Sequence, residues 1–181
     1  MKKWIVCISV LMCSSVVMFA KKQLSLTEGT AKDLQSVFAQ KDQQMLVVMD
    51  YSTTMWEDDG PYKEFCGNDY EKRVNDSYVA FIDAFNHKNK NMIQATADTT
   101  AEVKAKVVVK IDKLDRKFAG VGGYGKLYIC MYGTVTVYDA TDKAVASAEI
   151  YKLAGGEDYV EDDRLKKCFA NLAGKLKLLG K

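Results

Sequence analysis

Three oxygen-bearing side chains at alternate positions, Asp50, Ser52 and Thr54, follow an apolar run over residues 45–49. Carboxylate and hydroxyl oxygens are hard ligands of the kind that Mg²⁺ prefers. The spacing therefore offers a candidate metal site and, with it, a divalent-metal-dependent binding protein or hydrolase. The alternative, which we favour, is a strand-to-loop turn in which Asp50 and Ser52 hydrogen-bond the local backbone.

The segment Asp50-Tyr51-Ser52-Thr53-Thr54 resembles the metal-ion-dependent adhesion motif of von Willebrand factor A domains. In that family an aspartate and two hydroxyls help to hold Mg²⁺, so the resemblance implies Asp50, Ser52 and Thr54 as ligands. The chain departs from the family at Thr53, where glycine is usual, and at Thr54, where serine is usual. That fold also needs repeated strand–helix–strand units, whereas the pattern after residue 103 predicts consecutive strands.

The chain offers few other groups for catalysis. His87 is the only histidine, and its place among lysines and asparagines at the end of a helical pattern predicts exposure to solvent. Cys130 and Cys168 fall in apolar patterns typical of small buried side chains. Cys66 lies in a polar segment and is the candidate for a reactive or bridging thiol. We therefore expect neither an enzyme nor a cofactor.

Two features favour binding instead of catalysis. The glycine-rich segment 120–125 leads into a strand and not into a helix, which indicates a hairpin connection and not a phosphate-binding loop. Its tip, formed by Gly122, Gly123 and Tyr124, is a candidate contact for a partner. One face of the following strand carries a stripe of mostly tyrosine and threonine: Tyr128, Cys130, Tyr132, Thr134, Thr136 and Tyr138.

The role of this stripe depends on where the helices lie. If helices cover only the opposite, aliphatic face, then Tyr128, Tyr132 and Tyr138 are exposed and suit contact with a protein or a glycan. If helices cover both faces, the stripe is part of the core. The sequence leaves both possibilities open.

The elements that position these residues follow from hydrophobic periodicity. The continuous apolar run 45–49 predicts a strand covered on both faces. Helical spacing over 69–86 and 158–179 predicts two amphipathic helices, and alternation predicts three strands over about 103–112, 127–138 and 144–153, with a turn at 118–124. Residues 92–93 suggest an edge strand, and 21–40 and 53–68 look irregular. The order strand–helix–meander–helix predicts an α+β fold with a mixed, mostly antiparallel sheet and both helices packed on it.

The first twenty residues have the layout of a secretory signal peptide, with Lys2 and Lys3, an apolar run and then Ala20. We divide the chain into a signal peptide, 1–20, and a single α+β domain, 21–181, without a transmembrane helix. A lipid anchor on Cys13 is a less favoured alternative, because Met12 is too large for the position before it. Removal of both lysines takes the net charge from +2 to 2 − 2 = 0, which disfavours nucleic acid as a partner.

The span 45–179 resembles small exported bacterial envelope proteins, many without an assigned function. The shared features are Asp50-Tyr51-Ser52 after a buried strand, a helix ending in Phe85-Asn86-His87-Lys88, and a long meander closed by an amphipathic helix. The architecture is similar to the α/β domains of penicillin-binding-protein activator lipoproteins and to the amino-terminal module of the Tol-system propeller protein. The resemblance implies an exported, periplasmic or outer-envelope scaffold that binds a protein or cell-wall partner, and it transfers no functional residue.

Overall fold

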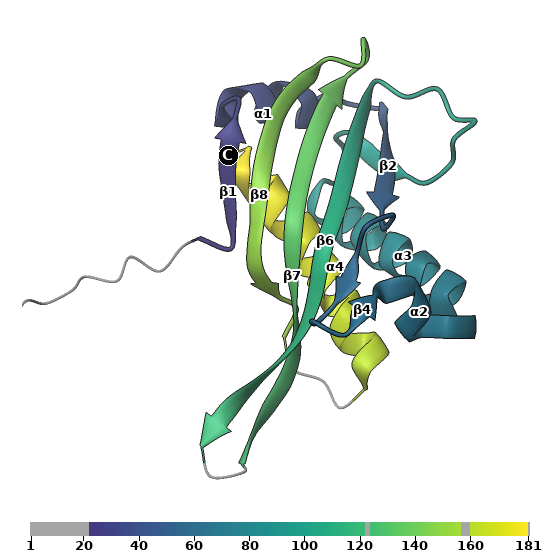
Figure 1. Ribbon diagram of the computed structural model, residues 1–181. Helices are drawn as coiled ribbons and strands as arrows, with labels where there is room; N and C mark the ends of the chain where they lie inside the picture. The colour runs from purple at the N-terminus through teal and green to yellow at the C-terminus, as the bar shows by residue number, and fades with distance from the viewer. Residues whose placement is uncertain (1–21, 122–123, 157–159, 181) are drawn as a thin grey trace, which may run out of the picture.

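The computed structural model describes residues 22–121, 124–156 and 160–180, and these form a sheet with helices packed on one face (Figure 1). The α+β class and the mixed, mostly antiparallel sheet are confirmed. The sheet has eight strands, and its main path runs β1-β8-β7-β6-β2-β5, with the short strands β3 and β4 beside β6. In chain order the elements are β1 (Leu24–Glu28), α1 (Ala31–Phe38), β2 (Gln44–Asp50), β3 (Met55–Trp56), β4 (Gly60–Pro61), α2 (Tyr62–Cys66), a 3₁₀ turn (Gly67–Asp69), α3 (Tyr70–Lys88), β5 (Gln94–Thr96), β6 (Ala105–Val121), β7 (Tyr124–Asp139), β8 (Ala144–Ala154) and α4 (Glu161–Leu179).

The predicted meander is present as β6, β7 and β8, which pair antiparallel in sequence order. Alternation places Val107, Val109 and Ile111 of β6 on the helix-covered side, where all three are fully buried. β2 pairs in parallel with β6 on one side and with β5 on the other, and this makes the sheet mixed. β5, and not residues 92–93, forms the edge strand on that side.

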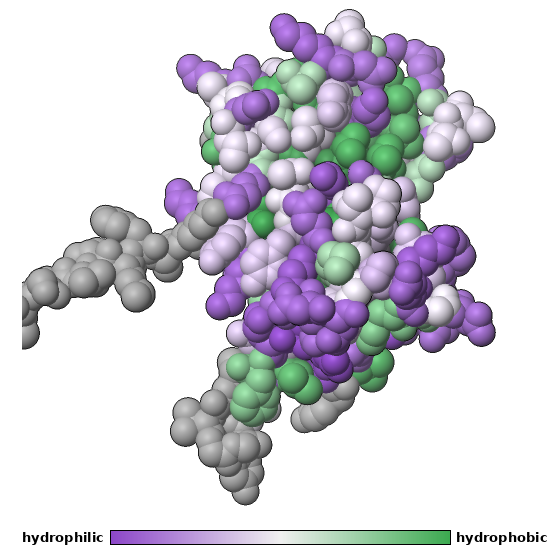
Figure 2. All heavy atoms as spheres, viewed as in Figure 1, coloured by the Kyte–Doolittle hydropathy of each residue, from purple (hydrophilic) through white to green (hydrophobic). Residues whose placement is uncertain are grey.

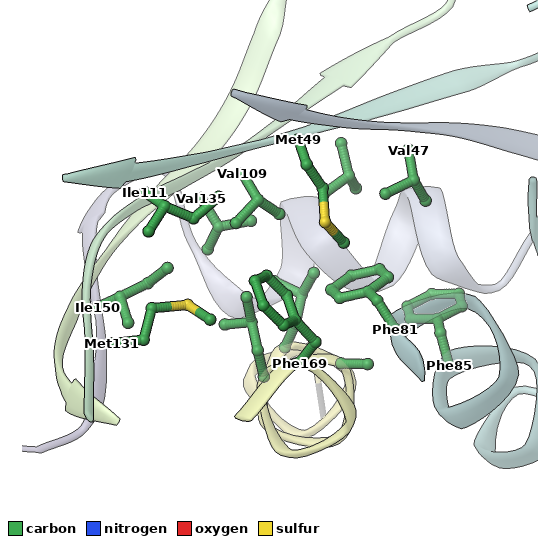
Figure 3. Packing of buried hydrophobic residues seen from close by; sticks show 14 of the residues in the cluster. Val47, Met49, Phe81, Phe85, Val109, Ile111, Met131, Val135, Ile150 and Phe169 are labelled. Atoms are coloured by element: carbon green, nitrogen blue, oxygen red, sulfur yellow. The ribbon is translucent and has the colours of Figure 1, made fainter. Parts of the chain in front are cut away.

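Helices α3 and α4 lie side by side on the sheet and enclose the core with it (Figure 3). Phe81 and Phe85 of α3 and Phe169 of α4 are fully buried and face the aliphatic side chains of the strands. Arg73 joins the two helices because its guanidinium contacts the carboxylates of Glu161 and Asp162, each at 3.1 Å. The acidic first turn of α4 therefore forms interhelical ion pairs.

Two segments predicted to be irregular are folded, so those predictions were wrong. Residues 21–40 contain β1, which pairs with β8, and α1, a further amphipathic helix on the sheet. α1 begins with a capping box in which Thr30 and Asp33 satisfy each other's backbone amides, and this signal was overlooked. Residues 53–68 contain β3, β4 and α2, which are held in place by the fully buried Trp56 and Tyr62.

The prediction that β2 is covered on both faces was also wrong. Met45, Val47 and Met49 are buried beneath the helices, but Leu46 and Val48 point to the other side and are only half-buried. Their neighbour on β6, Val108, is half-buried as well. The error arose because apolarity predicts that a face is suited to burial, while the elements of this chain cover only one face.

Residues 1–21 lie outside the described residues, and with them the predicted signal peptide and Cys13. No helix in the described ranges is long and apolar enough to cross a bilayer.

Candidate binding surface

The side of the sheet that carries no helix is the candidate binding surface, and we call it the open face (Figure 1). Tyr128, Tyr132 and Tyr138 all lie on it and are half-buried, so the stripe is not part of the helix-covered core. Cys130, in the same stripe, is fully buried by its neighbours. Of the predicted hairpin tip, Gly122 and Gly123 lie outside the described residues, while Tyr124 is the first residue of β7.

Strand register brings polar partners from β6 and β8 beside this stripe. Tyr132 lies next to Lys113 of β6, and its ring meets that of Tyr151 edge to face at 5.8 Å. Lys106 lies over the ring of Tyr138, with Nζ 4.9 Å from the ring centre. The open face is therefore defined by the following side chains: Leu46, Val48, Lys106, Val108, Lys110, Lys113, Lys117, Tyr128, Tyr132, Thr134, Thr136, Tyr138, Ser147, Glu149 and Tyr151.

The chemistry of the open face is that of a surface for noncovalent contacts. The hydroxyls of Thr136 and Ser147 are 3.1 Å apart and can each donate or accept a hydrogen bond. Burial raises the pKa of the Tyr132 hydroxyl. Burial also raises the pKa of the Cys130 thiol. Tyrosine rings are enriched at protein interfaces, whereas lysine is depleted there, so the tyrosines are the part of this face that favours a protein contact.

The hairpin of β6 and β7 extends beyond the helices as a two-stranded arm (Figure 1). The predicted turn at 118–124 was wrong, because β6 continues to Val121 and β7 begins at Tyr124. Phe118 and Leu127 face each other across the arm and are 52% and 42% exposed. A two-stranded ribbon has no core of its own, so these apolar side chains remain accessible.

A space-filling view from the helix-free side shows how these groups are distributed (Figure 2). Hydrophilic residues gather over the lower part of the strands, and a small apolar patch lies where the arm leaves the body. Two lysines of the open face are ion-paired, Lys113 with Asp58 and Lys117 with Asp115. Charges there are largely paired, so neither sign dominates the surface.

Two of the predicted metal ligands, Asp50 and Thr54, have hydrogen-bond partners within the protein. The Asp50 carboxylate accepts a hydrogen bond from the Ser52 amide at 2.9 Å, and hydrogen bonding to Ser52 lowers the pKa of Asp50. Thr54 is buried, and its hydroxyl donates to the carbonyl of Ile111 at 2.6 Å. The segment thus forms the favoured strand-to-loop turn, while the role of these residues as metal ligands stays a prediction. Within the described ranges, no group of three or more His, Cys, Asp or Glu residues is placed to hold a metal ion.

The other candidate groups are spread over the molecule. His87 is exposed at the end of α3, as expected. Glu57, from the acidic segment after β3, pairs with Arg116 at 2.7 Å. Cys66 was predicted to lie in a polar loop, and this was wrong: it ends α2 and is buried near Tyr62 and Arg73.

Burial raises the pKa of the Cys66 thiol, which predicts slow alkylation in the folded protein. At pH 8 less of the thiol is ionised, and the thiolate is the reactive form. We expect iodoacetamide to modify Cys66 about 100-fold more slowly in the native protein than in denaturant. Peptide mapping by mass spectrometry measures this ratio, and equal rates in the two states would identify an accessible, reactive thiol instead.

Comparisons with known proteins gave matches among solved structures alone. No protein-family model matches the chain, and no curated protein matches it. One solved structure of the PelC dodecamer from Paraburkholderia phytofirmans is 13% identical, with a TM-score of 0.44 over 86% of this chain and 96% of that one. A second, of a PelC variant from the same organism, is 11% identical, with a TM-score of 0.41 over 88% and 100%. The resemblance to penicillin-binding-protein activators and to the Tol module stays an expectation.

Proposed function

We propose that this protein is a non-enzymatic binding module of the bacterial cell envelope that holds a partner protein on its open face. The N-terminal segment would direct export, and the folded domain would act as a scaffold in the periplasm or at the outer envelope. The partner class is a protein, in preference to a cell-wall glycan. We prefer a protein because part of the open face is apolar, at Leu46, Val48 and Val108.

The observation that carries this proposal is the uncovered side of β2. Leu46 and Val48 are apolar and lie in the interior of the sheet, next to Val108, yet none of the helices in the described part of the chain covers them. Apolar side chains on a flat face gain free energy when another surface removes them from water. A protein partner with its own apolar side chains suits such a site better than a hydroxyl-rich glycan does.

The surrounding groups suit the edge of the same interface. Tyrosine buries a large ring at small cost in conformational entropy and keeps a hydroxyl for hydrogen bonding, so it is frequent at protein interfaces. Tyr132 and Tyr151 already hold each other edge to face, which limits the entropy that binding would cost. Phe118 and Leu127 alternate with Lys117 and Tyr128, so they point to the other side of the arm and are not part of the open face.

Site-specific photo-crosslinking in the native bacterium tests the proposal. A benzophenone amino acid in place of Tyr132 is expected to form one dominant adduct with an envelope protein. The matched position is Asp83, which is exposed on α3 on the opposite side of the sheet, and it should give no such adduct. Identical adducts from both positions, or none from Tyr132, would contradict the proposal.

A second variant shows whether the apolar strip itself makes the contact. Val48→Lys places a charge on the open face and is expected to weaken the Tyr132 adduct at least about tenfold, because a charge cannot be buried against an apolar partner without cost. Val79→Lys on the exposed side of α3, where the valine is 49% exposed, is the control and should leave the adduct unchanged. Circular dichroism verifies that both variants are folded.

A further inference from the structure

A polar basin lies at the start of β2, at the opposite end of the molecule from the arm (Figure 1). Its volume is about 550 Å³, and a second depression of about 480 Å³ adjoins it across Asp42, Gln43 and Gln44. Both depressions are shallow and open to solvent, so a ligand bound there would stay partly exposed. The first is lined by residues from three segments: Asp42, Gln43, Gln44, Asn86, Lys90, Asn91, Met92 and Gln94.

Hydrogen bonds between these segments hold the base of the basin in place. The carbonyls of Gln43 and Gln44 accept from the amides of Gln94 and Lys104, each at 2.9 Å. The side chain of Asn86 makes two hydrogen bonds to the backbone of Ala95, at 2.6 and 3.0 Å. The site is therefore formed before any ligand binds, which lowers the cost of binding.

The Gln94 side chain is also held, because its NH₂ group donates to the carbonyls of Asn89 and Met92. In the described ranges, the side chains of Gln43, Gln44 and Asn91 make no hydrogen bond to another residue. Each presents a carbonyl oxygen that accepts and an NH₂ group that donates twice. Asp42 and Lys90 add one charge of each sign, so the basin favours neither an anion nor a cation.

We propose that this basin binds a short, neutral carbohydrate. A sugar hydroxyl both donates and accepts, which matches the mixed capacity of side-chain amides. Met92 is the one large apolar residue in the lining of the first depression, so a peptide would bury little of its side chains there. This inference does not depend on the proposed protein partner, because the lining of the basin and the apolar strip share no residue, although Gln44 lies on the same side of β2 as Leu46.

NMR titration of the ¹⁵N-labelled domain with chitotriose, cellotriose and maltotriose tests the proposal. With at least one of them, we expect the side-chain NH₂ signals of Gln43, Gln44 and Asn91 to shift, with a dissociation constant of about 1 mM. Gln44→Ala should weaken that binding about tenfold, because an exposed amide is removed without loss of core packing. Gln35→Ala, on the exposed side of α1, is the matched control and should bind as the native protein does.

Each other outcome overturns the proposal. Absence of shifts at about 20 mM of every trisaccharide would exclude useful affinity. Shifts confined to residues outside the basin, or unchanged affinity in Gln44→Ala, would place the sugar elsewhere. Equal shifts with N-acetyl-triglycine amide would assign the basin to a peptide backbone.

Discussion

Replacement of Phe169 by alanine is expected to lower the free energy of unfolding by about 3–5 kcal/mol. Phe169 is fully buried in the middle of α4, where it faces the sheet beside Phe81 (Figure 3). Its ring also lies 6.2 Å from that of Tyr51, measured between ring centres. Truncation removes apolar area from the core and leaves a cavity that α4 and the sheet cannot close. Urea denaturation followed by circular dichroism measures the change.

The same helix supplies the control for this prediction. Leu178 is 59% exposed near the end of α4, and Leu178→Ala should change the free energy of unfolding by no more than about 0.5 kcal/mol. A loss below about 1 kcal/mol in Phe169→Ala would mean that α4 contributes little to the core. Equal losses in the two variants would instead indicate an effect on the helix itself.

Gly133→Val is the second variant with a large expected effect, a loss of about 3 kcal/mol or more. Gly133 lies in the middle of β7, opposite an irregularity in β6 between Ile111 and Lys113. A Cβ atom at this position would overlap the carbonyl oxygen of Lys110. Because that atom belongs to the backbone of the neighbouring strand, the strands must separate to relieve the clash.

A substitution at the neighbouring residue, Thr134, tests whether β7 tolerates substitution in general. Thr134 is half-buried on the open face, and Thr134→Val keeps a β-branched side chain of similar size. We expect it to change stability by no more than about 1 kcal/mol in denaturant titration. If Gly133→Val is equally mild, the approach of β6 to β7 at this point is wider than described.

The two proposed sites differ in polarity: one is apolar and the other is polar. The apolar strip formed by Leu46, Val48 and Val108 lies in its interior, on the side that the helices leave free. The basin lies where β2 begins, and its lining is almost entirely polar. A partner protein and a small carbohydrate would therefore contact different residues of the same domain.

Local patterns in the sequence were sufficient for much of the fold. The alternation in β6, β7 and β8 is regular, and the chain returns through a short turn between β7 and β8, so the antiparallel order follows from neighbours in sequence. α4 has apolar side chains at helical spacing, with acidic residues at its start and Lys177 in its last turn. These signals depend on a few consecutive residues, which is why the meander and the closing helix were predicted correctly.

Contacts between distant segments decided the rest. The Thr54 hydroxyl donates a hydrogen bond to the carbonyl of Ile111, which is 57 positions away in the sequence. The spacing of Asp50, Ser52 and Thr54 predicts a metal site but cannot predict this distant partner. The basin is assembled from the segments around Gln44, Asn86 and Gln94, which are polar and unremarkable in the sequence. These segments are close in space because β2 and β5 are neighbours in the sheet, and the strand order cannot be read from any one segment.

The open face shows the same division most clearly. The sequence by itself determined that the side chains of Tyr132 and Thr134 share one face of a strand, because strand geometry alternates every two residues. It also determined that β2 is apolar on both sides. Only the tertiary structure decided that α1, α3 and α4 all pack on the other side, since that choice depends on how the helices connect and pack across the whole domain. For this reason Leu46 and Val48 are apolar by sequence but accessible by fold.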